Sequence, residues 1–399
     1  MKQILKRAVS RSMPERISSR FSFPGGAYKG KKISAENFHA VKPGAARVSI
    51  GFVDGGQACV YEGDGISLHL IRAYGLIMRG KDTICTKKDE YYALIETEAE
   101  AGPSGDDQRA GGPVLGTEYS ITVLPGIGHP AQFEPSGLDS DTQATRFKHD
   151  KHYQQDKFDE RDKHGRTGAT AGIPEELRKL RISTLDRRLA TEGERASPAT
   201  AAGLLRRVAE IAMCQSLCHK LDGGDLLVLD GTLDTRFSDE REAMQGLLRA
   251  CEDKKVLMCA LSKSTSIATD DGHKASELLI RLGPKGAWYY HPVAEIPPDE
   301  NLPDVFFVKL HAISKEAFRF DIPPSQSRLF NAPKVFSILA YTSKDYILPG
   351  YPYGLVKADR FARVSDREKE YIRTSLVSGT GALEKIESRD LHSVLDSVS

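Results

Sequence analysis

The segment VLDGTL, residues 228–233, places an aspartate and a glycine directly after an apolar run. A near-copy, GFVDGG, stands at 51–56. Asp-Gly after an apolar strand is commonly the start of a turn. It is also an arrangement by which two strands deliver carboxylates to one metal ion, because ligands gather at strand ends in open α/β sheets. For Asp54 or Asp230 taken singly, both interpretations stay open.

The composition is that of a globular protein in water. The chain has 399 residues, enough for one large domain with insertions or for two domains. Its formal net charge of +1 gives the whole chain no attraction to nucleic acid, so any such attraction must be local. We see neither an apolar run of membrane-spanning length nor a signal-peptide core, and we expect a cytoplasmic protein without membrane contact.

Two segments differ in composition from the rest of the chain. Residues 1–32 hold nine Lys/Arg and a single acid. We therefore expect 1–40 to be a basic N-terminal arm, either frayed, or docking a partner or DNA phosphates, although a transit peptide has a similar composition. Residues 98–190 are polar and charged, which predicts an insertion of loops and solvated or disordered helix. The other predicted parts are a main domain, 41–375, and a C-terminal tail, 376–399.

The remaining sequence alternates strand and helix patterns. Strands are predicted at 47–54, 66–78, 90–97, 225–230, 256–264, 288–293, 305–311 and 334–342. Helices are predicted at 197–221, at 238–254 and, from about Leu355, over most of 351–377. The strand–helix–strand succession in the middle of the chain implies an α/β core with some parallel pairing.

Three acidic residues form a candidate metal site. Asp54 and Asp230 are each expected to end a strand, and Glu210 on the predicted helix can face the same crevice or be an ordinary exposed glutamate. Mg²⁺ and Mn²⁺ prefer several oxygen ligands, and two such ions can hold both reacting oxygens of a phosphodiester. The sequence contains no GxxxxGK[ST], GxGxxG, GxSxG or HExxH motif, so nucleotide-binding loops and serine or cysteine nucleophiles have no support.

Four blocks, in order, resemble the NurA nuclease family of archaea and bacteria: FVDGG, LVLDGTL, ALSKST and GYPYGLVKADRFARVS. The resemblance spans roughly 45–80, 200–266 and 300–365. Where relatives commonly have serine and proline, this chain has Gly56 and Gly354.

Within the α/β fold that the pattern predicts, the resemblance implies an RNase H-like core, with a mixed sheet flanked by helices. The additional β-rich elements and the charged insertion at 98–190 are predicted from the sequence pattern, and the resemblance does not cover the insertion. The resemblance implies Mn²⁺-dependent, or Mg²⁺-dependent, 5′–3′ exonuclease and single-strand endonuclease activity on DNA. It further implies a homodimer that works with a hexameric HerA-type translocase ATPase in resection of double-strand breaks.

The resemblance also implies site residues. Asp54, Glu210, Asp230 and Asp359 would hold the metal, Tyr351 would position a phosphate or a water molecule, and Lys263 would contact a substrate phosphate. Many relatives have histidine where Asp359 stands. A non-catalytic adaptor of a translocating ATPase, or an RNase, remains an alternative; metal titration and matched digestion of RNA and DNA separate them.

Overall fold

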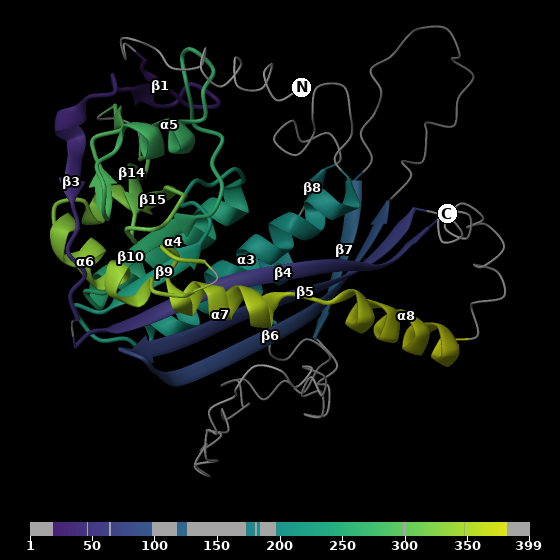
Figure 1. The fold of residues 1–399 in the computed structure, drawn as a ribbon. Coiled ribbons are helices and arrows are strands. Elements are labelled where there is room, and N and C mark those ends of the chain that lie inside the picture. Colours follow the sequence, from purple (N-terminus) through teal and green to yellow (C-terminus); the bar gives the residue numbers. More distant parts are fainter. Residues whose placement is uncertain are drawn as a thin grey trace, which may run out of the picture.

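An eleven-stranded mixed sheet organises the chain in the computed structural model (Figure 1). The structure describes residues 19–45, 47–63, 65–97, 118–125, 173–179, 182–183, 197–297, 301–346 and 348–380. In order across the sheet the strands are β3 (Phe38–Ala40), β12 (Trp288–Tyr290), β14 (Asp304–Lys309), β15 (Phe318–Ile322), β10 (Leu257–Ser262), β9 (Leu226–Asp230), β4 (Ser49–Gly63), β5 (Ile66–Arg79), β6 (Asp82–Thr97), β7 (Glu118–Pro125) and β8 (Ile182–Ser183).

The centre of this sheet has the expected RNase H-like arrangement. Strands β4, β5 and β6 form an antiparallel ribbon, and β9 and then β10 add to the other side of β4 in parallel. Parallel pairing requires a long crossover connection, and each of these two connections contains a helix. The predicted α/β class with a mixed sheet is therefore confirmed.

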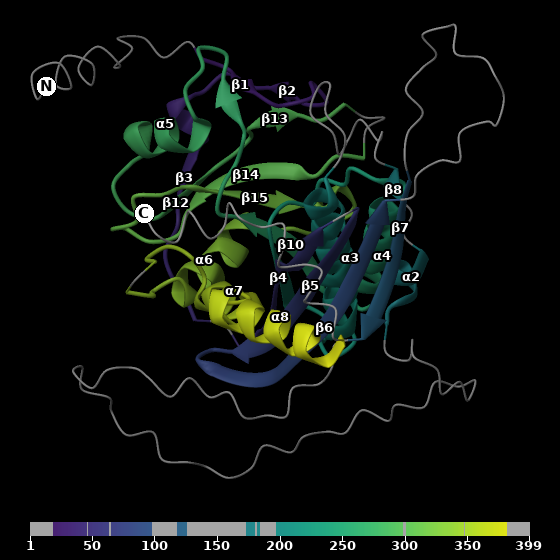
Figure 2. The same ribbon diagram turned by 90° about the vertical axis from the view of Figure 1, so that its right-hand side faces the viewer.

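Helices cover both faces of the sheet (Figure 2). One face packs against α3 (Pro198–Cys218) and α4 (Ser238–Asp253), and the other packs against α6 (Ala332–Thr342) and α7 (Tyr353–Ala362). The further helices are α2 (Glu175–Lys179), α5 (Ala275–Leu282) and α8 (Asp366–Thr380). The eleven-stranded sheet thus separates two apolar cores, one under each pair of helices.

Two small ladders lie outside this sheet. They pair β1 (Phe21–Ser22) with β11 (Ala268–Thr269) and β2 (Lys29–Gly30) with β13 (Ala294–Glu295).

Helix α3 begins as the sequence predicts. Ser197 is its N-cap, and its Oγ accepts a hydrogen bond from the backbone N–H of Thr200 at 3.2 Å. Pro198 occupies the first turn, where its missing N–H costs no helical hydrogen bond. Leu205, Val208 and the other apolar residues on the same stripe are buried against the sheet.

Two glycines let α7 lie directly on β4. A Cβ at Gly354 would lie 2.1 Å from Cδ2 of Phe52, and a Cβ at Gly56 would lie 2.2 Å from the carbonyl oxygen of Ala362. Both distances are far below van der Waals contact, so only glycine fits at either end of the helix. The two departures from the family pattern are thus part of one helix–strand contact.

Three predictions about local structure are wrong. Asp54 does not end its strand, because β4 continues to Gly63 while paired with β5. What ends there is the ladder with β9, whose last pair is Val53 with Leu229. Residues 334–342 are not a strand but most of α6, because the Asn331 side chain caps a helix by accepting from the N–H of Lys334. Finally, α7 starts at Tyr353, before the expected Leu355.

The described parts of the arm and of the insertion belong to the folded body. From Ser19 onward the predicted arm pairs and packs, with the Phe21 ring stacked on that of Phe307 at 6.0 Å. Within the insertion, β7 extends the main sheet, and Leu177 of α2 joins the core beneath α3. The sequences 1–18, 100–116 and 146–165, which motivated the predictions of an arm and of a polar insertion, lie outside the described residues.

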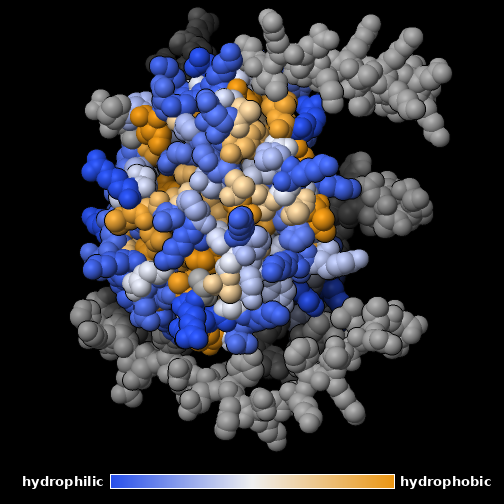
Figure 3. All heavy atoms as spheres, turned by 60° about the vertical axis from the view of Figure 1, so that its left-hand side comes forward, coloured by the Kyte–Doolittle hydropathy of each residue, from blue (hydrophilic) through white to orange (hydrophobic). Residues whose placement is uncertain are grey.

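The surface is mixed. Figure 3, which turns the left side of Figure 1 forward, shows apolar side chains in small groups among hydrophilic ones. In the described part of the chain, no helix combines the length and apolar character needed to cross a membrane.

Candidate metal centre

The register of β4 and β9 brings Asp54 and Asp230 together. The parallel ladder pairs Ile50 with Leu226 and ends with Val53 and Leu229, so the two aspartates are the next residues on adjacent strands. Neighbouring residues in register project to the same face of a sheet. Asp230 then ends β9, and Gly231 turns the chain away with a φ of 118°.

Helix α7 adds a third carboxylate from the end of the chain. Asp359 lies in its second turn, and the glycine contacts of α7 hold it against β4. One carboxylate oxygen each from Asp54, Asp230 and Asp359 lies within 4.8 Å of the other two. We call these three residues, with Lys263, the metal-centre cluster. Three of the four residues predicted to bind the metal, Asp54, Asp230 and Asp359, therefore lie close together in the structure.

Lys263 lies among these carboxylates. Its Nζ is 2.8 Å from Asp230 Oδ2, 2.8 Å from Asp359 Oδ1 and 3.8 Å from Asp54 Oδ2. Burial alone would lower the pKa of Lys263, but the aspartates outweigh burial and raise it. The residue predicted to contact a substrate phosphate is, in this structure, the counter-ion of the acidic residues.

Asp54 is the carboxylate most affected by its surroundings. Burial, followed by the charges of Asp230 and Glu210, raises the pKa of Asp54 to about 9, despite the opposing effect of Lys263. Like charges held this close cannot all be ionised without an added cation. Without one, Asp54 therefore carries a proton at neutral pH.

Glu210 lies beside the cluster rather than within it. It is 1% exposed, and Arg206 and Arg207 pair with its two oxygens, Arg207 at 3.4 Å. Burial raises the pKa of Glu210 although both arginines oppose the shift. Its side chain packs against Gly55, where a Cβ would lie 2.5 Å from Oε1. Its predicted role as a metal ligand stays a prediction.

Tyr351 is fully buried behind the cluster. Lys263 Nζ lies 5.3 Å from the centre of its ring, and its hydroxyl donates to the carbonyl of Leu261 at 3.5 Å. Burial and the charge of Asp230 raise the pKa of Tyr351 well above its ordinary value, so the phenol remains a neutral hydrogen-bond donor. A role in positioning the acidic side chains fits this burial better than direct contact with a substrate.

The cluster lies in a groove of about 1160 Å³. Its walls come from α3, from the loops after β9 and β10, and from the segment between β1 and β2. Six carboxylates and five cationic side chains line it. The carboxylates are Asp54, Glu210, Asp230, Asp234, Glu240 and Asp359, and the cations are Arg206, Arg207, Arg236, Lys263 and Arg319. The lining thus carries a slight formal excess of negative charge.

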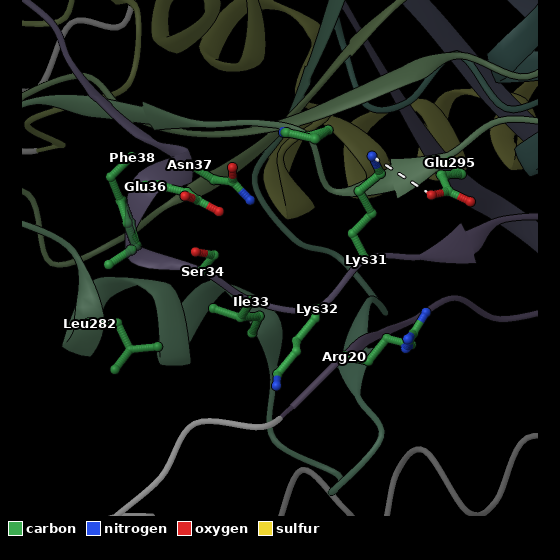
Figure 4. Close-up of a pocket in the computed structure, with 12 residues that line it drawn as sticks. Arg20, Lys31, Lys32, Ile33, Ser34, Glu36, Asn37, Phe38, Leu282 and Glu295 are labelled. Carbon is green, nitrogen blue, oxygen red and sulfur yellow. Dashed lines mark ion pairs between the residues drawn. The ribbon is translucent and has the colours of Figure 1, made fainter.

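A second hollow, of about 800 Å³, shares no lining residue with this groove. Arg20, Lys31 and Lys32 contribute its positive charge, and Glu36 and Glu295 its negative charge (Figure 4). Lys31 pairs with Glu295 at 3.8 Å. This hollow contains none of the three carboxylates of the metal-centre cluster, which makes it a weaker candidate metal site than the groove.

The metal-centre cluster fits a divalent ion. An ion about 2.1 Å from each oxygen would hold its ligand oxygens at most about 4.2 Å apart, and the three carboxylate oxygens, which lie within 4.8 Å of one another, can meet this limit with small side-chain movements. Asp230 Oδ2 is buried, and among the described residues it has no hydrogen bond besides its ion pair with Lys263 Nζ at 2.8 Å. A hard cation such as Mg²⁺ or Mn²⁺ would satisfy such an oxygen atom. A softer metal ion would instead prefer thiolate or imidazole ligands.

A second acidic group supports the loop after Asp230 and was not found from the sequence. Arg319 and Asp321, both on β15, pair at 2.7 Å, and Arg319 also pairs with Asp234 at 2.7 Å. Asp321 Oδ2 accepts the backbone N–H of Leu233 at 3.0 Å. We call Asp234, Arg319 and Asp321 the β15 cluster. The only sequence signal for it is an alternation of charged and apolar residues, FRFDI, at 318–322.

Comparison with known proteins adds little to this geometry. No protein-family profile and no curated protein matches the sequence. Among solved structures, the catalytic domain of human Endonuclease V is similar at 10% identity and a TM-score of 0.34, over 86% of this chain and 92% of that one. Argonaute from Aquifex aeolicus is similar at 10% identity and a TM-score of 0.31, over 80% of this chain. The chain spans 28% of that Argonaute. At these TM-scores neither similarity supports a functional conclusion, and the NurA resemblance stays a prediction.

Proposed function

We propose that this protein is a divalent-metal-dependent nuclease that hydrolyses phosphodiester bonds in DNA. The observation that carries the proposal is the meeting of Asp54, Asp230 and Asp359 within 4.8 Å, from three separate elements, in a groove. The expected family activity needs such a site.

The chemistry divides between an ion and the chain. When bound, Mn²⁺ or Mg²⁺ supplies Lewis acidity and a nucleophile derived from water. Asp54 and Asp230 hold ligand oxygens at a spacing fixed by two adjacent strands, and Asp359 closes the site from α7. Asp54 would hold a metal ion only in its ionised form, because ligand carboxylates must be deprotonated.

The charge of the groove makes DNA binding depend on the ion. The lining has six carboxylates and five cations, so with Asp54 protonated its formal charges balance and it offers a phosphate backbone no net attraction. A bound divalent ion would add positive charge, and Arg206 and Arg207 on the α3 wall of the groove would attract the flanking phosphates.

The test compares wild type with Asp54→Asn and Asp230→Asn on single-stranded and duplex DNA, in Mn²⁺, in Mg²⁺ and in a chelator. Loss of a metal ligand removes several kcal/mol of transition-state stabilisation, so each variant is expected to lose at least about a thousandfold in rate while remaining folded. Asp253→Asn, at an exposed helix end, is the matched control. Wild-type rates in either variant would refute the site.

The finer parts of the proposal rest on the sequence resemblance. They are 5′–3′ exonuclease and single-strand endonuclease activity, homodimer formation, and work with a hexameric HerA-type ATPase in end resection. End-labelled DNA establishes polarity, and co-purification with the ATPase tests the partnership. An RNase would instead cleave matched RNA faster, and an adaptor would bind the ATPase without binding Mn²⁺.

A further inference from the structure

Lys263 occupies the position that a metal ion would need. Its ammonium group contacts Asp230 and Asp359 at 2.8 Å and approaches Asp54 at 3.8 Å. These are the same three residues whose oxygens form the ligand set. A single cationic group thus pairs with all three carboxylates of the cluster and offsets part of their charge.

An ammonium group and a divalent ion cannot share this position. An ion about 2.1 Å from the same carboxylate oxygens would lie close to Nζ, and the repulsion between the two cations is strong at such distances. We propose that Lys263 is a built-in competitor of the metal: it holds the three carboxylates together before the ion binds, and it must withdraw when the ion enters. This inference rests on the function proposed above.

The chain gives Lys263 room to withdraw. Its side chain is 37% exposed and follows β10 in the segment SKSTS, which lines the groove through Ser262, Ser264, Thr265 and Ser266. Its flexible four-carbon stem allows the ammonium to turn from the carboxylates toward the groove. There it meets an arriving phosphate, so the same residue serves first as counter-ion and then as substrate contact.

The inference predicts that removing the charge of Lys263 raises the Mn²⁺ affinity. A lysine that only supported the metal ligands would give the opposite change. Lys263→Met removes the competing charge and keeps a stem of similar length. Mn²⁺ affinity should therefore rise by about tenfold or more, because the ion no longer displaces a paired cation. The same variant should melt at lower temperature than wild type in a chelator, since the carboxylates lose their counter-ion, and should recover with Mn²⁺.

The experiment is a Mn²⁺ titration of the full chain, followed by calorimetry and by the electron paramagnetic resonance signal of free Mn²⁺. Lys263→Arg keeps the charge and should bind Mn²⁺ as wild type does. Lys274→Met, at a lysine 73% exposed on the surface, controls for the change in net charge. Tighter binding only in Lys263→Met supports the inference.

Two other outcomes count against it. If Lys263→Met binds Mn²⁺ as wild type does, or more weakly, the lysine is not a competitor, although the metal site and the proposed nuclease stand. If neither wild type nor Lys263→Met binds Mn²⁺, the metal site itself fails, and both proposals fall. Cleavage rates are not needed for either conclusion.

Discussion

Two acidic groups lie side by side in this fold and differ in how their charge is balanced. In the β15 cluster two aspartates share Arg319, and a backbone N–H satisfies Asp321 as well. In the metal-centre cluster three aspartates share Lys263, and among the described residues Asp230 Oδ2 has no hydrogen bond. The formal excess of negative charge is one in the β15 cluster and two in the metal-centre cluster, where Asp54 lowers it by keeping a proton. The β15 cluster fixes a loop in place, whereas a bound cation would replace that proton in the metal-centre cluster.

Among the substitutions that test this difference, Arg319→Met is expected to have the largest effect on the free energy of unfolding. Asp321 is completely buried, so removing its partner leaves an uncompensated charge and should cost about 3–5 kcal/mol in the free energy of unfolding. Chemical denaturation measures this loss. Lys263→Met should cost clearly less, because Asp54 already carries a proton and the side chains of Lys263 and Asp359 are partly exposed to water. Equal losses in the two variants would remove the distinction between the clusters.

Gly354→Ala tests how the third carboxylate is held. The added Cβ would meet Phe52 at 2.1 Å, so α7 must shift, at a cost of about 1–3 kcal/mol. Because Asp359 moves with the helix, Mn²⁺ affinity should fall as well. Gly246→Ala is the control, since its Cβ would meet only the end of the flexible Gln215 side chain, at 3.2 Å. Unchanged Mn²⁺ affinity in Gly354→Ala would show that α7 does not set the site.

The surplus charge should also appear in the pH dependence of stability. The pKa of Asp54 is about 9 in the folded protein against an ordinary value of 3.8, so the folded state keeps a proton that the unfolded chain releases. Wild-type stability therefore falls as pH rises through this window. Asp54→Asn cannot titrate, and in a chelator its advantage over wild type should grow from about pH 5 to about pH 8. Thermal unfolding of both proteins across this pH range measures the difference in stability. A difference that does not change with pH would contradict the prediction.

The smallest expected effect is a change of metal preference. Asp359→His should retain part of the activity and shift the Mn²⁺/Mg²⁺ activity ratio toward Mn²⁺, because imidazole suits Mn²⁺ better than Mg²⁺. Asp359→Ala is the comparison variant and should lose most activity. If the ratio stays at the wild-type value while Asp359→Ala is active, Asp359 is an ordinary surface carboxylate paired with Arg363.

The sequence predicts the strands that carry Asp54 and Asp230, because each is a short apolar run that ends in Asp-Gly. It does not predict that β4 continues past Asp54, since Gly55 and Gly56 look like a turn and only the antiparallel partner β5 keeps them extended. Residues 334–342 fail for a similar reason: their β-branched content favours a strand, but the cap at Asn331 decides for a helix. The position of Lys263 among the carboxylates depends on tertiary contacts that no local pattern encodes.

The ends of the sheet have a consequence for assembly. The described sheet ends with β3, of three residues, on one side and with β8, of two residues, on the other. The three-residue β3 offers few free backbone groups to another chain, whereas β8 pairs only with Glu118 and Tyr119 of β7, so among the described strands residues 120–125 of β7 are the longer edge. If the proposed homodimer extends the sheet, β7 is the described edge at which it can do so, and each subunit would keep its own set of three carboxylates.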